Sequence, residues 1–362
     1  MKLRSSLLVS TIALSTFTLA SSAIAAGDIV YSARYYAAPG SHETSHAHLY
    51  RISDDGSGRT QLTTGAHDDS VIGWSPNGKS ILFLRDDKAL CIVDEFGGKP
   101  RTLVTIPDSS DLAPWAAKWW PDSKAVIIPC RDNGMQGEVI SASTGKVLSS
   151  FKDVQWLSAS PEGDRAYVHD GNGGAVATLS ADHKLSILRS LTVHAKAAEW
   201  IGGEAIVGLI DGEGDTSDTL QGFDDNGSKL WTRVVDVKHS AGDDLGSVFR
   251  NVTTIPGDLR TVILGEDISD STIRPNYNFW QANVDTGKAS VWLSEKQFIT
   301  FKPNSRSYLT SPAKVLVNFG KPKGGHQRQV YVCGLEVGKA PSDTRPKAIV
   351  TGLVFVDGAD WR

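Results

Sequence analysis

Cysteine is scarce in this 362-residue sequence, which argues against a fold held together by disulfides. There are three cysteines, an odd number, and each lies in a separate apolar run typical of a strand: Cys91, Cys130 and Cys333. Small disulfide-bonded domains carry an even number of cysteines at framework spacings instead. We therefore expect buried free thiols. A nucleophilic cysteine is the alternative interpretation.

Clustered positive charge is also missing. The sequence has 37 Lys and Arg against 41 Asp and Glu, a formal net charge of −4. Neutralising the phosphates of a nucleic acid requires a clustered basic surface, so the charge argues against a nucleic-acid partner. Apolar residues almost nowhere recur with the helical period, so we expect very little helix.

The first 25 residues have the pattern of a signal peptide. Lys2 and Arg4 precede an apolar stretch over residues 7–20, and Ala23-Ile24-Ala25 is a small-x-small cleavage pattern. The stretch is too short and too rich in Ser and Thr to make a good membrane span. Removal of residues 1–25 leaves 337 residues with a net charge of −6, because 35 basic and 41 acidic residues remain. We expect a periplasmic or secreted protein without a membrane span.

Six short segments share one pattern, in which an apolar run ends in a turn rich in Pro, Gly, Asn and Asp. They begin at Trp74, Trp119, Ser160, Trp200, Thr254 and Phe301, and a seventh fragment occupies residues 355–360. The prolines of the first three recur after 45 and then 40 residues. Periods of this length with several short strands per repeat are typical of radial arrays such as β-propellers.

Residues 70–104 show one repeat most clearly. Four strand-like runs, at 70–74, 80–85, 89–94 and 99–105, are separated by Gly, Pro, Asn and Asp. The same plan fits residues 116–150, 154–189, 197–235, 249–294 and 298–340. One four-stranded antiparallel sheet cannot bury both of its faces alone, whereas sheets packed face to face around an axis can.

The two chain ends are expected to complete one blade. Strands at residues 28–34, 48–52 and 60–62 lack a first strand, which residues 349–356 can supply. The sequence therefore predicts an all-β fold: a seven-bladed β-propeller of four-stranded antiparallel blades, with the ring closed by the C-terminal strand joining the N-terminal blade. We expect residues 26–362 to form this single domain and the protein to be a monomer.

Residues 49–63, followed by Trp74-Ser-Pro-Asn-Gly-Lys79, resemble the repeat of the TolB-type, WD-repeat-like β-propellers. The resemblance is specific in the first three repeats and patchy after residue 165. Such propellers include the Tol-Pal envelope protein, caps of prolyl-peptidase-like hydrolases, and polysaccharide lyases. This chain lacks the α/β domain that precedes the propeller in the Tol-Pal envelope protein. It also lacks the G-x-S-x-G nucleophile elbow of the prolyl-peptidase-like hydrolases, and no length remains for a hydrolase domain. The resemblance therefore implies a fold more than a function.

Acidic residues recur where the second strand of several repeats ends, at loops expected on one face of the ring. Carboxylates around a channel mouth are suited to a cation or to a basic or hydroxyl-rich ligand; the alternative is that Asp serves these turns by bonding its own loop backbone. These acids and nearby basic residues together make up the candidate ligand-binding residues, which are Arg34, Asp86, Arg131, Asp132, Asp170, Asp211 and His326.

Two segments could hold a metal, although no cofactor is predicted. His42-Glu-Thr-Ser-His46 matches H-E-x-x-H, but its surroundings disfavour the helix that this motif needs. His42, His46 and His48 could still bind a transition metal, with solvated loop histidines as the alternative. Residues 211–218 alternate acids as calcium loops do, but lack the later glutamate and the flanking helices of an EF-hand. A solvated hairpin tip is the alternative there.

A complete ring without a recognised catalytic constellation favours a non-enzyme. We expect a binding module that holds a protein or carbohydrate ligand on its loop face. The alternative is a polysaccharide lyase or another glycan-active enzyme that works in the central funnel, where His, Arg, Tyr or Lys would move protons.

Overall fold

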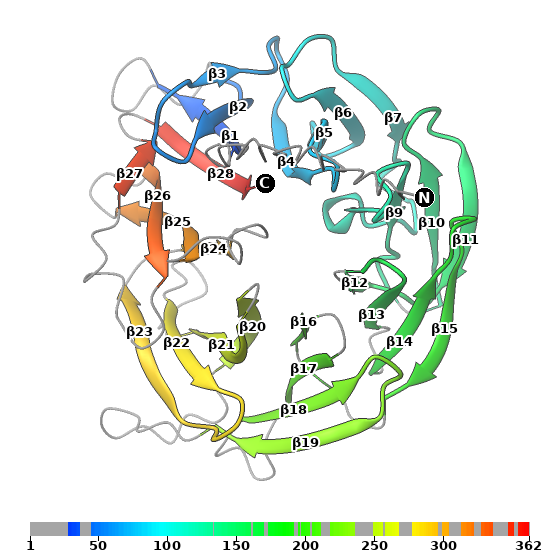
Figure 1. Ribbon diagram of the computed structural model, residues 1–362. Coiled ribbons are helices and arrows are strands. Elements are labelled where there is room, and N and C mark those ends of the chain that lie inside the picture. The colour runs from blue at the N-terminus through cyan, green and yellow to red at the C-terminus, as the bar shows by residue number, and fades with distance from the viewer. Residues whose placement is uncertain are drawn as a thin grey trace, which may run out of the picture.

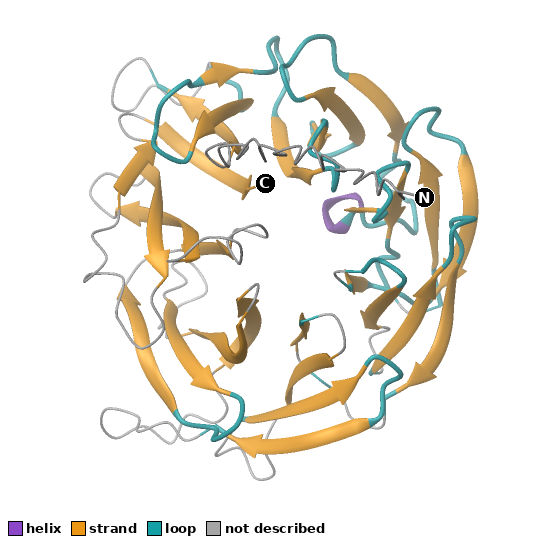
Figure 2. Cartoon of the chain, in the orientation of Figure 1, coloured by secondary structure: helices purple, strands orange, loops and turns teal. Residues whose placement is uncertain are grey.

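The structure is a computed structural model, and it describes the greater part of the chain from residue 28 to residue 361. The described residues are 28–36, 45–132, 134–160, 162–169, 173–191, 195, 197–202, 205–210, 218–235, 249–255, 258–267, 277–295, 299–303, 313–321, 327–335, 347–350 and 354–361. Within them the chain is all-β, and the one helical element is a single 3₁₀ turn, η1 (Pro114–Ala116) (Figure 2). The predicted signal peptide lies outside the described residues.

Four-stranded antiparallel sheets account for all the named strands, and Figure 1 shows them arranged around a common centre. The first contains β28 (Val354–Trp361), β1 (Asp28–Tyr35), β2 (His48–Ser53) and β3 (Thr60–Gln61). The second contains β4 (Asp69–Trp74), β5 (Ser80–Arg85), β6 (Ala89–Asp94) and β7 (Arg101–Thr105). The third contains β8 (Lys118–Trp119), β9 (Ala125–Ile128), β10 (Gln136–Ser141) and β11 (Val147–Lys152).

The later sheets follow the same order along the chain. The fourth contains β12 (Trp156–Ala159), β13 (Arg165–His169), β14 (Gly174–Leu179) and β15 (Leu185–Ser190). The fifth contains β16 (Ala197–Ile201), β17 (Ala205–Ile210), β18 (Thr219–Asp224) and β19 (Lys229–Val234). The sixth contains β20 (Phe249–Ile255), β21 (Asp258–Asp267), β22 (Tyr277–Asn283) and β23 (Ala289–Glu295). The seventh contains β24 (Ile299–Pro303), β25 (Ala313–Lys321), β26 (Gln327–Leu335) and β27 (Lys347–Val350).

The all-β class and the four-stranded antiparallel sheets expected of propeller blades are confirmed. The strands of the second sheet agree with the predicted runs to within two residues. No helix in the described part of the chain combines the length and apolar character that crossing a membrane requires. The predicted burial of the thiols holds for Cys91 and Cys130, which are buried and free. The side chain of Cys333 lies outside those described.

The turn between the first and second strands of a sheet forms for a local chemical reason, as Pro76-Asn-Gly78 shows. In the second sheet, Gly78 donates its N–H to the Ser75 carbonyl at 2.8 Å and has a φ of +70°. Glycine accepts that left-handed conformation at little steric cost. Asn77 Oδ1 accepts from the Ser75 hydroxyl at 2.8 Å and from the Lys79 N–H at 3.0 Å. The turn is therefore stabilised from within, before any packing against another sheet.

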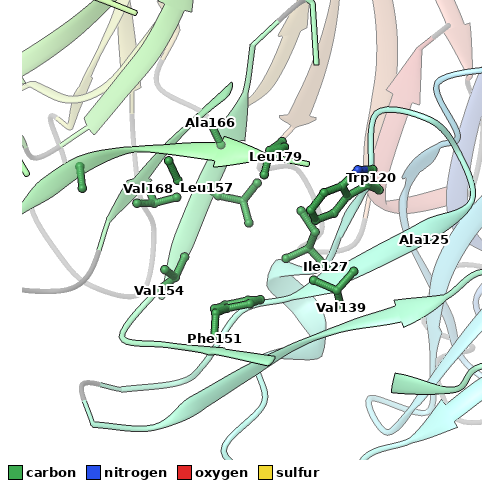
Figure 3. Close-up of a cluster of buried hydrophobic side chains, with 12 residues drawn as sticks. Trp120, Ala125, Ile127, Val139, Phe151, Val154, Leu157, Ala166, Val168 and Leu179 are labelled. Atoms are coloured by element: carbon green, nitrogen blue, oxygen red, sulfur yellow. The ribbon is translucent and has the colours of Figure 1, made fainter. Parts of the chain in front are cut away.

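Packing between sheets is apolar, as Figure 3 shows for the third and fourth sheets. Trp120, Ile127 and Phe151 of the third sheet or its turns meet Leu157 and Val168 of the fourth in one buried cluster. Further clusters join the first sheet to the second, the second to the third, the fourth to the fifth, the fifth to the sixth, and β27 of the seventh to the first. At these junctions the burial of a sheet face therefore depends on a neighbouring sheet.

The C-terminal strand differs in detail from the prediction. β28 pairs antiparallel with β1, but it begins at Val354, whereas Ile349 and Val350 belong to β27. The prediction of one strand over residues 349–356 was therefore wrong in its bounds. The Asp-Gly at 357–358 was expected to be a turn, yet it lies within β28, where the register with β1 shifts between Ser32 and Ala33. An irregularity of this kind accommodates an extra residue in the strand without reversing the chain.

β28 is also bonded to the second sheet. Asp360 Oδ2 accepts a hydrogen bond from the Trp74 N–H at 2.7 Å. The carboxylate can approach the β4 backbone because residue 73 is glycine: a Cβ added there would lie 2.7 Å from Asp360 Oδ2. A residue close to the C-terminus thus connects the first sheet to the second at their inner edges.

Replacing Asp360 with alanine tests this connection. Leaving a partly buried N–H without its acceptor costs about 1–3 kcal/mol, so we expect urea denaturation to show a loss of unfolding free energy of that order. Asp360→Asn retains an amide oxygen and should lose less. The matched control, Asp108→Ala, removes an exposed carboxylate and should change stability by less than about 0.5 kcal/mol. Equal stability of Asp360→Ala and the wild type would contradict the connection.

Candidate functional site

Two polar regions stand out, one on a loop face and one at the inner edges of the sheets. In an antiparallel sheet, the loop after the second strand and the connection to the next sheet leave by the same edge. The segments 62–68, 86–88, 106–117, 129–132 and 134–135 therefore gather on one face of the first three sheets, which we call the loop face. This face carries most of the described candidate residues.

Asp68 is the centre of a polar network on the loop face. Its Oδ2 accepts from Arg34 Nη2 at 2.7 Å, and its Oδ1 accepts from the Ala47 N–H at 2.7 Å. His46 Nδ1 lies 3.7 Å from the same Oδ1. Arg34 also donates to the Ser45 carbonyl at 3.1 Å. The carboxylate thus holds the end of β1 against the segment that leads into β2.

Asp86 extends this network from the second sheet. It has a φ of +51°, which Asp tolerates better than most residues. Its Oδ1 accepts from the Asp68 N–H at 2.9 Å, and its Oδ2 lies 2.7 Å from His67 Nδ1. Partial burial raises the pKa of Asp86, but the Asp68 N–H and the His67 ring outweigh it, so that the pKa is lowered. The Asp86 carboxylate therefore joins the loop after β5 to His67 and Asp68, which precede β4.

A buried ion pair lies beneath the network. Asp69 is fully buried and receives two hydrogen bonds from Arg85, Nε to Oδ1 at 2.7 Å and Nη2 to Oδ2 at 2.9 Å. His48 lies nearby, and burial lowers its pKa despite the attraction of Asp69. The structure thus brings Arg34, His46 and Asp86 together around Asp68, with His48 beside Asp69.

Sequence reasoning missed three members of this cluster: His67, Asp68 and Asp69. Their signal was present, because three polar residues directly precede the first apolar strand of the second repeat. Within the described residues there is no group of three or more His, Cys, Asp or Glu side chains able to hold a metal. His42, Asp170, Asp211 and His326 lie outside the described residues, so their proposed roles stay predictions.

Arg131, a candidate ligand-binding residue, also holds an aromatic ring in place, which the sequence did not reveal. Its Nε donates to the Leu112 carbonyl at 2.8 Å and its Nη1 to the Asp108 carbonyl at 3.1 Å. The guanidinium lies 5.1 Å from the ring centre of Trp115, which belongs to η1 and is 61% exposed. A cation over an indole is attracted by the ring electrons. Arg131 thereby presents a large apolar ring to solvent in a fixed place.

The surroundings of Trp115 are acidic. Among the described residues of the loop-face segments, exposed carboxylates outnumber exposed amines, and the amine of Lys88 lies 3.3 Å from the Asp108 carboxylate. The exposed acids of this part of the loop face are Asp86, Asp87, Asp108, Asp111 and Asp132. Such a surface attracts cationic and hydroxyl-rich groups and repels anions.

The second region is a central pocket of about 250 Å³. Figure 1 shows β4, β12, β16 and β28 lying toward the centre of the arrangement. These strands and β8 line the pocket, so five sheets contribute to it. Its polar and aromatic lining residues are Trp74, Lys118, Trp119, Trp156, Ser158, Glu199 and Asp360. The sequence singled out only Trp156 among them, as one of several indoles that could stack on a sugar ring, because the others looked like strand, core or turn residues of their own repeats.

Glu199 is the most perturbed acid of the pocket. Its Oε1 accepts from the Ser158 hydroxyl and from the Trp200 N–H, the latter at 3.3 Å. Burial raises the pKa of Glu199, and the Ser158 hydroxyl, the Trp200 N–H and the charge of Lys118 oppose that rise only in part. The carboxyl therefore holds its proton to higher pH than an ordinary glutamate.

Indole hydrogen bonds fix the inner strands that carry the pocket. Trp119 Nε1 donates to the Gly73 carbonyl of the preceding sheet at 3.2 Å. Trp200 Nε1 makes the equivalent bond to the Ser158 carbonyl at 2.8 Å. The same kind of hydrogen bond at two sheet junctions fixes the distance between the neighbouring strands that line the pocket.

Comparison with known proteins adds no identification. No model of a known protein family matches the chain, and no curated protein matches it. Function is therefore inferred from the geometry of the loop face and the pocket.

The raised pKa of Glu199 predicts a pH-dependent stability. Above about pH 4, the ordinary range of glutamate, the unfolded chain releases a proton that the folded chain retains. Stability therefore falls as pH rises toward the folded pKa. Glu199→Gln keeps the acceptor for Ser158 and removes this titration, so its unfolding free energy relative to wild type should rise over that window. Denaturation at several pH values measures it, with the exposed Glu162→Gln as a control. A constant difference across pH would contradict the assignment.

Proposed function

We propose that this protein is an exported β-propeller that binds a protein or glycan ligand on its loop face. We further propose that its sheets are the seven blades of one closed ring, similar to the TolB-type propellers. Two observations support closure: β28 pairs with β1, and apolar clusters join the first sheet both to the second sheet and to β27. In a closed ring the sixth sheet packs against the seventh in the same way.

One observation carries the binding proposal: the exposed Trp115 indole held by Arg131 on the loop face. An immobilised aromatic ring loses little conformational entropy when a ligand covers it, which is why Trp and Arg are enriched at binding hot spots. Indoles also stack on the apolar faces of sugar rings. The surrounding carboxylates favour basic or hydroxyl-rich ligands. They disfavour a polyanionic glycan.

A second candidate is a glycan-active enzyme that works in the central pocket. Glu199 favours it, because a carboxyl with a raised pKa is suited to general acid catalysis. Asp360 supplies a second carboxyl to the same pocket. A polysaccharide lyase is the weaker version, because the pocket offers a single basic side chain, Lys118, among its lining residues for neutralising a uronate.

Replacing Trp115 with alanine tests the loop-face site. The immobilised protein is first screened against neutral and acidic glycans and against peptide arrays, and the dissociation constant of the best ligand is then measured. Trp115→Ala should weaken it by about tenfold or more. Phe96→Ala is the matched control, because Phe96 is also exposed and lies 5.3 Å from a guanidinium, that of Arg51, but belongs to the turn after β6 at the opposite edge. The Phe96→Ala variant should bind the ligand with the same dissociation constant as the wild type.

Two results would contradict the binding proposal. The first is a ligand whose affinity depends on Phe96 but not on Trp115. The second is turnover of a glycan that Glu199→Gln abolishes and Trp115→Ala leaves intact, which would favour the enzyme.

A further inference from the structure

The central pocket has a chemistry of its own, separate from the loop face. It has about 250 Å³ of space, somewhat below the roughly 300–1,000 Å³ of pockets for drug-sized ligands. A ligand that fills it is therefore small. Its lining combines indoles, carboxyls, an amine and a hydroxyl contributed by different sheets, and the indole hydrogen bonds described above fix the strands that carry several of them.

The lining carries charges of both signs, so an ion of either sign meets at least one group that repels it. Glu199 and Asp360 repel an anion, and Lys118 repels an ammonium group. A neutral ligand avoids both penalties and can still use all three groups, because hydroxyls donate to carboxylates and accept from an amine.

Glu199 has bonding capacity left for such a ligand. Its Oε1 is taken by the Ser158 hydroxyl and the Trp200 N–H, whereas its Oε2 has no hydrogen-bond partner among the described residues. Glu199 is partly buried, and a hydrogen bond to a carboxyl oxygen that is partly removed from water is favourable. As a carboxylate this oxygen accepts from a ligand hydroxyl, and when protonated the carboxyl donates to one.

Trp156 offers the aromatic surface. Its ring is partly buried, lies edge-on to Tyr167 with ring centres 6.0 Å apart, and lines the same pocket as Glu199. A hydroxyl-rich ring presents an apolar face made of its C–H groups to such an indole and its hydroxyls to polar groups around it.

We infer that the central pocket is a binding site for a neutral, hydroxyl-rich ligand of monosaccharide size, held by Glu199, Asp360 and Lys118 with Trp156 against its ring. The site is independent of the loop-face proposal, since it uses different residues on different strands. It holds a free sugar or the terminal unit of a chain by the same contacts.

Calorimetric titration of the whole protein tests this inference. The probes are glucose, galactose, mannose and N-acetylglucosamine, with choline and glucuronate as cationic and anionic comparisons. We expect at least one neutral sugar to bind with a dissociation constant of about 1 mM or below. Choline and glucuronate should bind at least about tenfold more weakly. Saturable binding of choline or glucuronate in preference to every neutral sugar, or no saturable binding of any probe, would overturn the inference.

Variants then place the sugar in the pocket. Trp156→Ala should weaken binding about tenfold, whereas Trp156→Phe retains a flat ring and should bind within a few-fold of wild type. Glu199→Ala should weaken binding comparably. Thermal midpoints verify that each variant is folded, and the phenylalanine variant keeps the test decisive if the alanine variant is unstable.

The loop-face variant separates the two proposals. Phe96→Ala, which changes an exposed ring outside both proposed sites, should leave monosaccharide affinity unchanged. Loss of affinity in Trp115→Ala together with full affinity in Trp156→Ala would place the sugar on the loop face. That result would overturn the pocket assignment while supporting the proposed function.

Discussion

Apolar contact between the faces of neighbouring sheets is the interaction on which this structure depends. A four-stranded sheet has two faces, and its central strands are apolar on both, as Phe83 and Leu82 of β5 illustrate by packing into different clusters. Burying one such side chain contributes about 1.5–3 kcal/mol. No sheet can gain this alone. The order of the sheets, their spacing and the position of the inner strands all follow from this mutual burial.

The site residues are placed by that packing rather than by local structure. The central pocket draws one or a few residues from each of five sheets, so that Lys118, Ser158 and Glu199 meet although they are far apart in sequence. Indole bonds from Trp119 and Trp200 to carbonyls of the preceding sheets keep these walls in register. On the loop face, by contrast, Arg131 positions Trp115 through bonds to a nearby connection. One region therefore depends on the whole array and the other on a single sheet junction.

Local signals predicted the strands well, because each strand is bounded by turn residues whose backbone preferences are intrinsic. The Ser75-Pro-Asn-Gly78 turn is an example, since its own hydrogen bonds define it. The same reliance on local signals gave a wrong prediction of a turn at Asp357-Gly358. This pair has turn character, but pairing with β1 holds it in a strand. Strand bounds near the C-terminus are thus decided by a partner more than 300 residues away, which local patterns do not reveal.

The candidate site was less predictable. Arg34, His46 and Asp86 were recognised as polar residues of loops, and the structure gathers them around Asp68. Glu199 could not be recognised, because its importance arises from neighbours on other sheets and from burial, and the sequence did not place Trp156, one of several indoles able to stack on a sugar, beside it. Spacing along the chain carries no information about which inner strands face one another.

We propose that the two chain ends close the array through β28. Amide hydrogen exchange of the native protein tests it most directly, because exchange reports the free energy of opening each strand. Closure predicts that those amides of Val354–Trp361 that donate to β1 exchange as slowly as the amides of β5 in the second sheet. Exchange of β28 at the rate of the exposed turns, with β5 still protected, would show that the C-terminal strand frays independently and would contradict the account.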